Sequence, residues 1–291
     1  MSAVIRRIAA SDYAEAAQVW RTCFPEDSDE FVEYYFAERT RPEFVLAAFV
    51  DGMIVSNMHI IPQELQLHDC TLRMGFISGV ATLLAFRRIG LASELFATAF
   101  EQMRTAEFDV TVLQPFDHRF YAKYGYVPFV RRKIAIMEAH ERDGRDDLTA
   151  PDAALMERAY NAYMAKYQGG AVRTPATYAS LLREFSLPGA RAAAAGAAYA
   201  LLYEDGDGAV VHELCGDVHS VRRLLSGLSG AYSRVAFPLP LDCECALPSR
   251  EEVFSVICPL NPNAEALLRR DSLDSDAPAA HRRPLFAFDR Y

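Results

Sequence analysis

The alternation of apolar and polar residues in the first half of the chain predicts short strands interrupted by two amphipathic helices. Strands are expected at residues 4–8, 44–50, 53–60, 74–82 and 109–113, and helices at residues 11–20 and 90–103. Ser11 and Asp12 offer N-caps to the first helix, and Asp51-Gly52 is a hairpin turn signal. An aromatic segment, residues 116–129, follows the last of these strands.

The second half repeats this kind of pattern. We expect a helix at residues 152–167, strands at 193–203, 209–214 and 234–237, and a helix capped by Asp217. Between the halves, residues 141–147 are almost all charged, and Pro151 follows them. The sequence therefore predicts a domain at 1–140, a linker at 141–151, and a second domain at 152–291 that ends in a short tail after Phe237.

The two halves also resemble each other in the order of their elements. Each contains an apolar strand, an Asp-Gly turn, a second apolar strand, and a later helix and strand, with an offset of about 155 residues. Self-similarity on this scale predicts a duplicated α/β unit rather than a solenoid.

Composition narrows the classes of function. The 291 residues are 51% hydrophobic and 24% charged, which suits two globular domains. The formal net charge of −9 argues against a broad nucleic-acid surface and favours cationic or neutral partners. No apolar run reaches the ~20 residues of a membrane-spanning helix, and the N-terminus lacks the apolar stretch of a signal peptide. We therefore expect a cytoplasmic protein with no membrane or nucleic-acid partner.

The cysteines and histidines predict no metal site. Of six cysteines, only Cys243 and Cys245 are close in sequence, and no second pair completes a zinc motif. His59, His68 and His118 also lack the spacing of metal ligands. We expect buried or idle thiols and no metal cofactor.

The segment with the clearest chemistry lies at residues 79–93. An apolar strand is followed by a short connection, the basic pair Arg87-Arg88, Gly90 and an amphipathic helix. Gly90 and the small Ala92 let the backbone approach a ligand closely, and the helix N-terminus presents unpaired N–H groups. With the two arginines, these groups predict a pyrophosphate cradle. The alternative is an arginine-rich turn that binds nothing.

These residues resemble the GNAT superfamily of acyl-CoA-dependent N-acetyltransferases over residues 1–140. Residues 87–92 match its phosphate loop, Q/R-x-x-G-x-G/A, and residues 120–126 match its F-Y-x-x-x-G-F/Y signature. The resemblance implies a mixed α/β fold, with mostly antiparallel twisted sheets flanked by helices, and acetyl-CoA as co-substrate. It implies that Val80, Ala81 and Thr82 pair with the pantetheine arm. It places the phosphates on Arg87, Arg88, Ile89, Gly90, Leu91, Ala92 and Ser93.

The whole chain is similar to a narrower group, the enhanced-intracellular-survival (Eis-like) acetyltransferases. That resemblance implies tandem GNAT-like units, one acetyl-CoA site per chain because the second half lacks the phosphate loop, and a homo-oligomer. Members also carry a third, sterol-carrier-like domain, which we expect to be absent here or reduced to a remnant.

The same resemblance implies catalytic roles for three tyrosines. Tyr126 matches the general acid that protonates the leaving thiolate, and Tyr121 matches the tyrosine with that role in other GNAT enzymes. Tyr291, the last residue, matches the aromatic residue whose terminal carboxylate acts as the base. The alternative for the internal tyrosines is packing in an aromatic core, which we favour for Tyr124.

The acceptor is the least defined feature. An acidic run, Glu26, Asp27, Asp29, Glu30 and Glu33, either attracts a cationic amine or is a solvated helix face. The leading prediction is acetyl transfer to a primary amine of a cationic small molecule, such as an aminoglycoside or a polyamine. The alternatives are a protein lysine or N-terminal acetyltransferase, and a non-catalytic acyl-CoA-binding protein.

Overall fold

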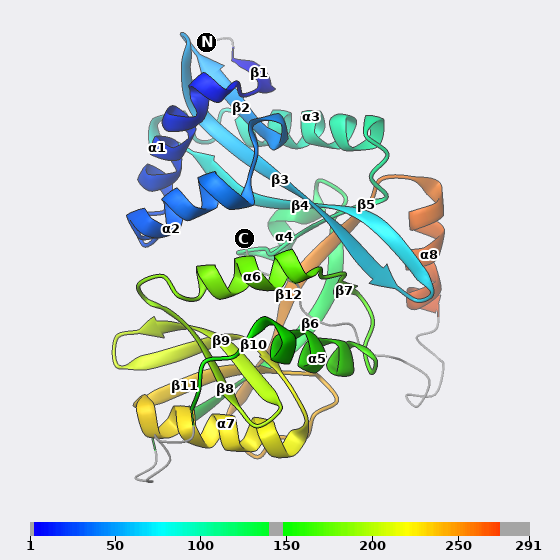
Figure 1. Ribbon diagram of the computed structural model, residues 1–291. Coiled ribbons are helices and arrows are strands. Elements are labelled where there is room, and N and C mark those ends of the chain that lie inside the picture. Colours follow the sequence, from blue (N-terminus) through cyan, green and yellow to red (C-terminus); the bar gives the residue numbers. More distant parts are fainter. Residues whose placement is uncertain (1–2, 140–147, 274–291) are drawn as a thin grey trace.

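The computed structural model describes residues 3–139 and 148–273 (Figure 1). The elements of the first half, in chain order, are β1 (Val4–Arg7), η1 (Ala10–Asp12), α1 (Tyr13–Cys23), α2 (Asp29–Tyr34), the π-helical turn η2 (Tyr35–Arg39), η3 (Pro42–Phe44), β2 (Val45–Val50), β3 (Met53–Leu67), β4 (Cys70–Thr82), η4 (Leu84–Phe86), α3 (Leu91–Thr105), β5 (Val110–Leu113), α4 (His118–Ala122) and β6 (Val127–Glu138).

The second half contains α5 (Ala153–Met164), β7 (Gly170–Ala171), α6 (Pro175–Glu184), β8 (Ala190–Ala195), β9 (Ala198–Asp205), β10 (Gly208–Cys215), α7 (Val218–Ala231), β11 (Arg234–Leu239), β12 (Ser249–Pro259) and α8 (Pro262–Leu273). The predicted mixed α/β fold, with a large twisted sheet flanked by helices, is confirmed.

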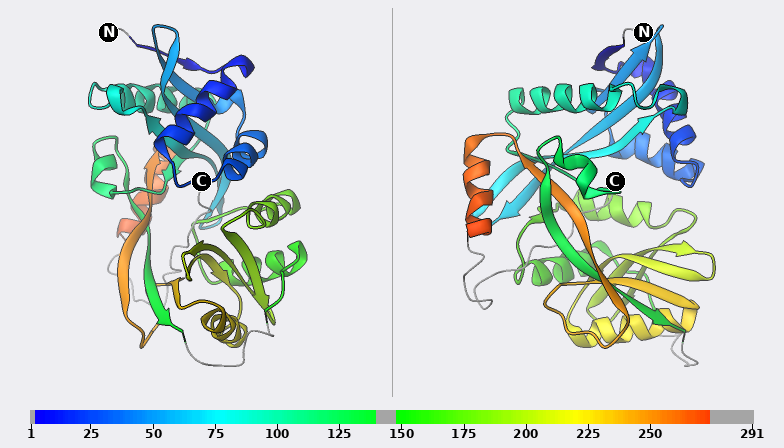
Figure 2. Two further views of the ribbon diagram at one scale, coloured as in Figure 1. Left: turned by 90° about the vertical axis from the view of Figure 1, so that its left-hand side faces the viewer. Right: turned by 180° about the vertical axis from the view of Figure 1, so that it is seen from behind.

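The two halves share one sheet because each contributes a strand to the other. Among the described residues the sheet has 12 strands. Eleven follow the path β1-β2-β3-β4-β5-β12-β6-β11-β10-β9-β8, and β7 pairs with β3 off this path. β12 lies between β5 and β6 and is antiparallel to both. β6 continues into the second half, where it pairs with β11. Figure 2 shows β6 and β12 as the long strands that join the halves.

Helices cover both faces of the first half of the sheet. α1, α2 and η2 pack on one face through a core that includes Trp20, Tyr35 and Phe76. α3 and α4 pack on the opposite face through a core that includes Phe96 and Tyr121. The side view in Figure 2 shows these two pairs of helices on opposite sides of the sheet.

The second half repeats the order helix, helix, three antiparallel strands, helix and strand. α5 and α6 correspond to α1 and α2, β8–β10 to β2–β4, α7 to α3, and β11 to β5. The expected offset of about 155 residues is therefore wrong, because it aligned the β2–β3 turn with the β9–β10 turn. Asp-Gly turns mark both hairpins, so the turn signal alone cannot say which hairpin is which.

Two further expectations are corrected. The single strand expected at residues 193–203 is a hairpin, β8–β9, whose turn is formed by Gly196 with φ +61. The chain after Phe237 is not merely a tail, because β12 and α8 pack against the first half. Residues 249–273 therefore lie with the first unit rather than with the second, to which the sequence assigned them. Residues 140–147 of the expected linker lie outside the described part.

The first helix also begins differently from the prediction. Asp12 makes no side-chain cap bond to α1. Its carboxylate instead accepts from the Ala9 backbone N–H and from the Arg6 guanidinium, both at 2.8 Å. These bonds to Arg6 in particular hold the pKa of Asp12 below its usual range.

Candidate functional site

Strands β4 and β5 are parallel neighbours that separate before β4 ends. They pair only from Met74↔Val110 to Phe76↔Val112, whereas β4 continues to Thr82. Within the described chain, the last residues of β4 have only β3 as a neighbouring strand. Their free backbone edge can pair with an extended ligand, as sheet edges do with peptides.

A β-bulge interrupts this free edge at Gly79. Residues 57–59 of β3 lie opposite residues 78–81 of β4, so β4 carries an extra residue. Gly79 has φ +57, and a Cβ on it would lie 2.1 Å from Cζ3 of Trp20. Both the backbone angle and the indole therefore require glycine here, and Trp20 of α1 fixes the shape of the bulge.

The N-terminus of α3 lies just beyond this edge and carries no side-chain cap. Its N-cap residue is Gly90, with φ +97, and nothing lies within 4 Å of the position a Cβ would take. Arg87 and Arg88 precede it and are exposed, and the Arg87 side chain donates to the Thr82 carbonyl at 2.9 Å. First-turn N–H groups that no side chain caps, beside two arginines, can hold a pyrophosphate.

The structure brings the predicted cofactor-binding residues together along this strand and turn. Ala81 and Leu91 are buried, while Val80, Thr82 and Ala92 are half-buried and Arg87, Arg88, Ile89, Gly90 and Ser93 are exposed. The Ser93 hydroxyl lies 3.1 Å from that of Tyr124, whose ring stacks on Phe96 with centroids 4.3 Å apart. The turn is thus linked to the segment that follows α4.

Tyr126 lies on the face of the sheet that α3 covers, and its ring packs beside those of Phe96 and Phe100. It is 2% exposed, and its hydroxyl lies 3.0 Å from that of Thr111 on β5. Burial raises the pKa of Tyr126 well above its usual value, and the hydrogen bond to Thr111 opposes that rise. The phenol is therefore protonated at neutral pH.

Tyr121, on α4, belongs to the same aromatic cluster. Its ring centroid lies 6.2 Å from that of Tyr126 and 5.6 Å from that of the exposed Phe116. Burial raises the pKa of Tyr121 to about 12. Both candidate acids are neutral phenols in a core cluster that also contains Ile77 of β4 and Leu113 of β5. Tyr291, the candidate base, lies outside the described residues.

The equivalent place in the second half is occupied by the protein itself. Asp217 caps α7, and its carboxylate accepts from the backbone N–H groups of His219 and Ser220. The corresponding first-turn N–H groups of α3 receive no side-chain cap, although the Ser93 N–H donates to the Gly90 carbonyl. The carboxylate would repel an incoming phosphate, so α7 is unsuited to anion binding.

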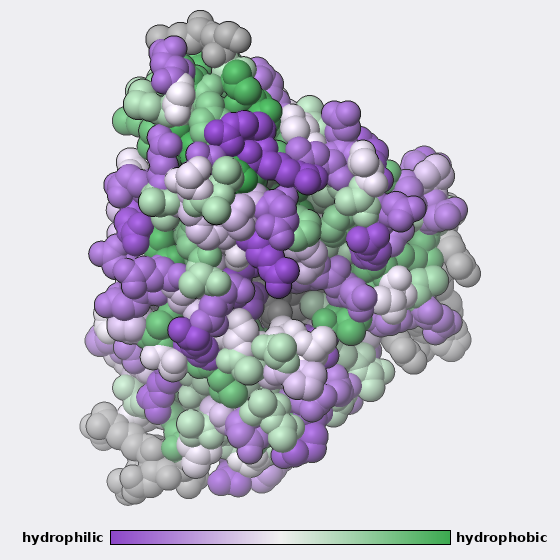
Figure 3. All heavy atoms as spheres, turned by 45° about the horizontal axis from the view of Figure 1, so that its top comes forward, coloured by the Kyte–Doolittle hydropathy of each residue, from purple (hydrophilic) through white to green (hydrophobic). Residues whose placement is uncertain are grey.

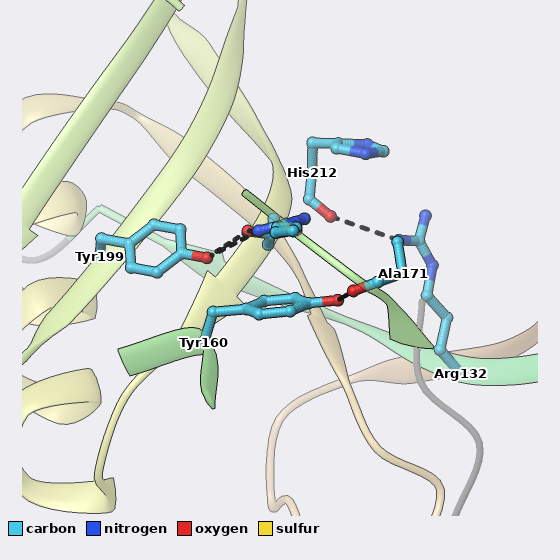
Figure 4. A network of polar contacts seen from close by, with 7 residues as sticks. Arg132, Tyr160, Ala171, Tyr199 and His212 are labelled. Atoms are coloured by element: carbon cyan, nitrogen blue, oxygen red, sulfur yellow. Dashed lines mark hydrogen bonds and ion pairs between the residues drawn. The ribbon is translucent and has the colours of Figure 1, made fainter. Parts of the chain in front are cut away.

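A buried ion pair occupies the region next to the bulge of β10. The bulge lies at His212, and the next residue, Glu213, pairs with Arg173 at 2.5 Å and accepts from the Tyr199 hydroxyl. The Arg173 guanidinium also lies 3.8 Å from the centre of the Tyr160 ring. Figure 4 shows the Tyr199 hydroxyl pointing into this network and the Tyr160 hydroxyl pointing at the Ala171 carbonyl, to which it donates at 2.7 Å. Arg173, Glu213, Tyr199 and Tyr160 thus contact one another at this place in the second half.

A pocket of about 590 Å³ opens beside α4, between it and the strands β6 and β12. Its lining includes Phe116, which is 79% exposed, and both charge signs, from Asp117, Arg119, Arg131 and Glu251. Asp117 and Arg119 pair with each other, and the guanidinium holds the pKa of Asp117 at about 2. His118 also lines this pocket.

The acidic run lies on the opposite face, around α2. Asp27 accepts from the Trp20 indole at 2.7 Å, and Asp29 pairs with Arg21. The remaining three, Glu26, Glu30 and Glu33, are exposed. Figure 3 shows polar side chains over much of the face it presents, which is hollowed near its centre.

The contribution of β12 to the site is not predicted from the sequence. Cys258 of β12 packs against the segment of the tyrosine motif, where a Cβ on Gly125 would lie 3.4 Å from its Sγ. The apolar run at residues 253–258 was the available signal for this strand, but nothing in it indicates pairing with β5. All six cysteines are free.

Two absences concern the described residues only. No group of three or more metal-binding side chains occurs in residues 3–139 and 148–273. In the same ranges, no helix is both long enough and apolar enough to cross a membrane.

Parts of the chain are similar in sequence or in fold to known acetyltransferases. Residues 4–129 match the acetyltransferase (GNAT) domain family. No curated protein matches the chain. A GCN5-related N-acetyltransferase from Kribbella flavida has 16% identity and a TM-score of 0.67, covering 88% of this chain and 70% of that one. Eis1 from Mycobacterium abscessus has 13% identity and a TM-score of 0.64, covering 89% and 74%. At these identities the likeness shows a shared fold.

Proposed function

Because residues 4–129 are an acetyltransferase (GNAT) domain, we propose that this N-acetyltransferase moves the acetyl group of acetyl-CoA to a primary amine of a cationic small molecule. The observation that carries the proposal is the contrast between two helix N-termini. That of α3 is open at Gly90 beside Arg87 and Arg88, whereas that of α7 is closed by Asp217. This contrast supports one acetyl-CoA site per chain.

The co-substrate would follow the free edge of β4. The residues present fit it, because the open first turn of α3 suits the phosphates and the unpaired strand edge suits the amides of the pantetheine arm. In this arrangement Val80, Ala81 and Thr82 supply the strand edge. Arg87, Arg88 and the first turn through Ser93 supply the phosphate contacts.

Acetyl transfer needs a polarised thioester carbonyl, a neutral amine and a proton for the leaving thiolate. The amine lone pair forms a C–N bond as the C–S bond breaks. We assign the proton donor to Tyr126, with Tyr121 as the alternative. If Thr111 donates its hydroxyl proton to the Tyr126 oxygen, then the phenolic proton of Tyr126 is free for the thiolate. The base expected at Tyr291 lies outside the described residues and stays a prediction.

The exposed Glu26, Glu30 and Glu33 support a cationic acceptor, because they lie on the α2 side and have no ion-pair partner in the described chain. A charge of this sign would raise the local concentration of polyamines or aminoglycosides. The attraction between these carboxylates and a cationic amine would weaken with added salt, since interactions between exposed charges are screened.

The test compares two substitutions of Gly90 whose side chains have nearly the same shape. Gly90→Asp introduces a carboxylate at the phosphate cradle, as Asp217 does in α7, whereas Gly90→Asn keeps the shape and tolerates positive φ. Coenzyme A affinity, measured by calorimetry, should fall at least about tenfold more in the Asp variant than in the Asn variant, since charge repulsion adds to bulk. Equal affinities in the two variants would place the phosphates elsewhere.

Turnover is tested by the release of coenzyme A thiol from acetyl-CoA in the presence of single amines. Polyamines and aminoglycosides should be acetylated, and the rate at low amine concentration should fall with salt. Binding of acetyl-CoA without thiol release for any amine would favour a non-catalytic acyl-CoA-binding protein. Acetylation of peptide lysines alone would change the acceptor class.

A further inference from the structure

Ser180 of α6, in the second half of the chain, contacts the π-helical turn η2 of the first half. Tyr34 of α2 donates to the Ser180 carbonyl at 2.9 Å, and the two hydroxyl oxygens lie 2.7 Å apart. Arg39 donates to the same Ser180 hydroxyl at 3.1 Å. Tyr34 is the residue before η2 and Arg39 is its last residue, so α6 contacts the π-helical turn at both of its ends.

The contact is a built interface rather than a chance surface approach. Tyr34 is 4% exposed and Arg39 is half-buried. A neighbouring ion pair, Arg183 with Glu38, joins the same two elements. Single π-turns in proteins are rare and occur often at functional sites.

The turn is connected inward to the bulge of β4. Tyr35 is fully buried, and its ring lies 4.4 Å from that of Trp20. Trp20 in turn fills the space that a side chain on Gly79 would need. The ring of Tyr35 is held by packing and by the turn that carries it, and its hydroxyl interacts with Ser78, the β4 residue just before Gly79.

We propose that Ser180 is a positioning residue for acetyl transfer, which acts by fixing the π-helical turn and, through Tyr35 and Trp20, the bulge at Gly79. This inference rests on the proposed function, in which the β4 edge holds the thioester. It gives the second half a role in the reaction although its own equivalent site is filled. Phosphate binding at α3, on the other face of the sheet, is independent of this connection.

The test is Ser180→Ala in the full chain, with Ser186→Ala as the matched control. Alanine suits a helix interior, and the Tyr34 bond to the Ser180 carbonyl remains. Ser186 is an exposed serine just after α6 that bonds only within its own turn. We expect kcat to fall about fivefold or more in Ser180→Ala, because small displacements of reacting groups are costly. The KM for acetyl-CoA should stay within about twofold, and the control should behave as wild type.

A second measurement separates positioning from general stability. Amide hydrogen exchange in residues 35–40 should quicken in Ser180→Ala while exchange in α3 stays unchanged. A wild-type kcat in Ser180→Ala, or unchanged exchange at these residues, would overturn the proposal. Additive effects of Ser180→Ala and Tyr34→Phe on kcat in a double-mutant cycle would also overturn it, because two residues that act through one contact should be coupled. Failure of the wild type to bind coenzyme A would instead refute the proposed function itself.

Discussion

His59 provides a direct test of how closely the core between the sheet and the helices α1 and α2 is packed. Its side chain is fully buried on β3, and neither ring nitrogen has a hydrogen-bond partner in the described chain. The rings of Trp20, Tyr35 and Phe36 lie 5.2–5.4 Å from it. Burial lowers the pKa of His59 from 6.5 to about 3, because the apolar surroundings disfavour the imidazolium.

The sign and size of the effect on stability follow from this shift. Below pH 6.5 the unfolded chain binds a proton at His59 that the folded chain refuses, so stability is lost as pH falls from 6.5 towards 3. Between pH 7 and pH 5 the loss is about 2 kcal/mol, from 1.36 kcal/mol per pH unit over about 1.5 units. This figure depends little on the folded pKa, provided that the folded pKa of His59 stays below about 4.

The assay is urea denaturation of the wild type and of His59→Phe at pH 7 and pH 5. Phenylalanine keeps a planar ring among the neighbouring rings and cannot be protonated. The variant should therefore lose about 2 kcal/mol less than the wild type over this range, while carboxylate effects cancel in the difference. His219→Gln, at an exposed histidine of α7, should lose as much as the wild type. If His59→Phe and the wild type lose equal amounts, then water or a charge reaches this imidazole and the reasoning is refuted.

Three further outcomes are expected. Gly79→Ala should destabilise the fold by roughly 3 kcal/mol or more in denaturation, because its Cβ meets the indole, whereas Gly52→Ala, at positive φ but in open space, should cost about 1 kcal/mol. Thr111→Val should raise the pKa of the adjacent phenol further and lower kcat at least about tenfold, with little change in coenzyme A affinity by calorimetry. Arg173→Met should cost about 3–5 kcal/mol by leaving a buried carboxylate without its cation, whereas Arg119→Met, in an exposed pair, should leave the free energy of unfolding nearly unchanged.

The sequence predicted the elements that depend on local chemistry. The Asp51-Gly52 turn, the helix after Gly90 and the cap at Asp217 all occur where expected, because each is determined by residues close in sequence. The grouping of the phosphate-loop residues at one helix N-terminus followed for the same reason. Roles for these residues stay predictions until ligand binding is measured.

Features that depend on long-range pairing were not predictable in this way. Nothing in the apolar run of β12 indicates that it would lie beside β5 rather than beside β11. Periodicity identifies a strand but not its neighbour, which is selected by the register and by the faces that must be buried. Likewise, the alanine-rich residues 190–203 contain one glycine as the only turn signal, so a hairpin was mistaken for a strand.

The exchange of strands explains why a second unit with a filled site remains part of the molecule. β5 has β4 on one side, and without β12 its other edge would be bare, so the candidate acid Tyr126 would lose the strand against which it packs. β11 in turn depends on β6, which comes from the first unit. Each half therefore completes the sheet of the other, and neither buries its core alone. On this argument, selection on catalysis in the first half also constrains the second, even though the second has its own carboxylate where the phosphates would bind.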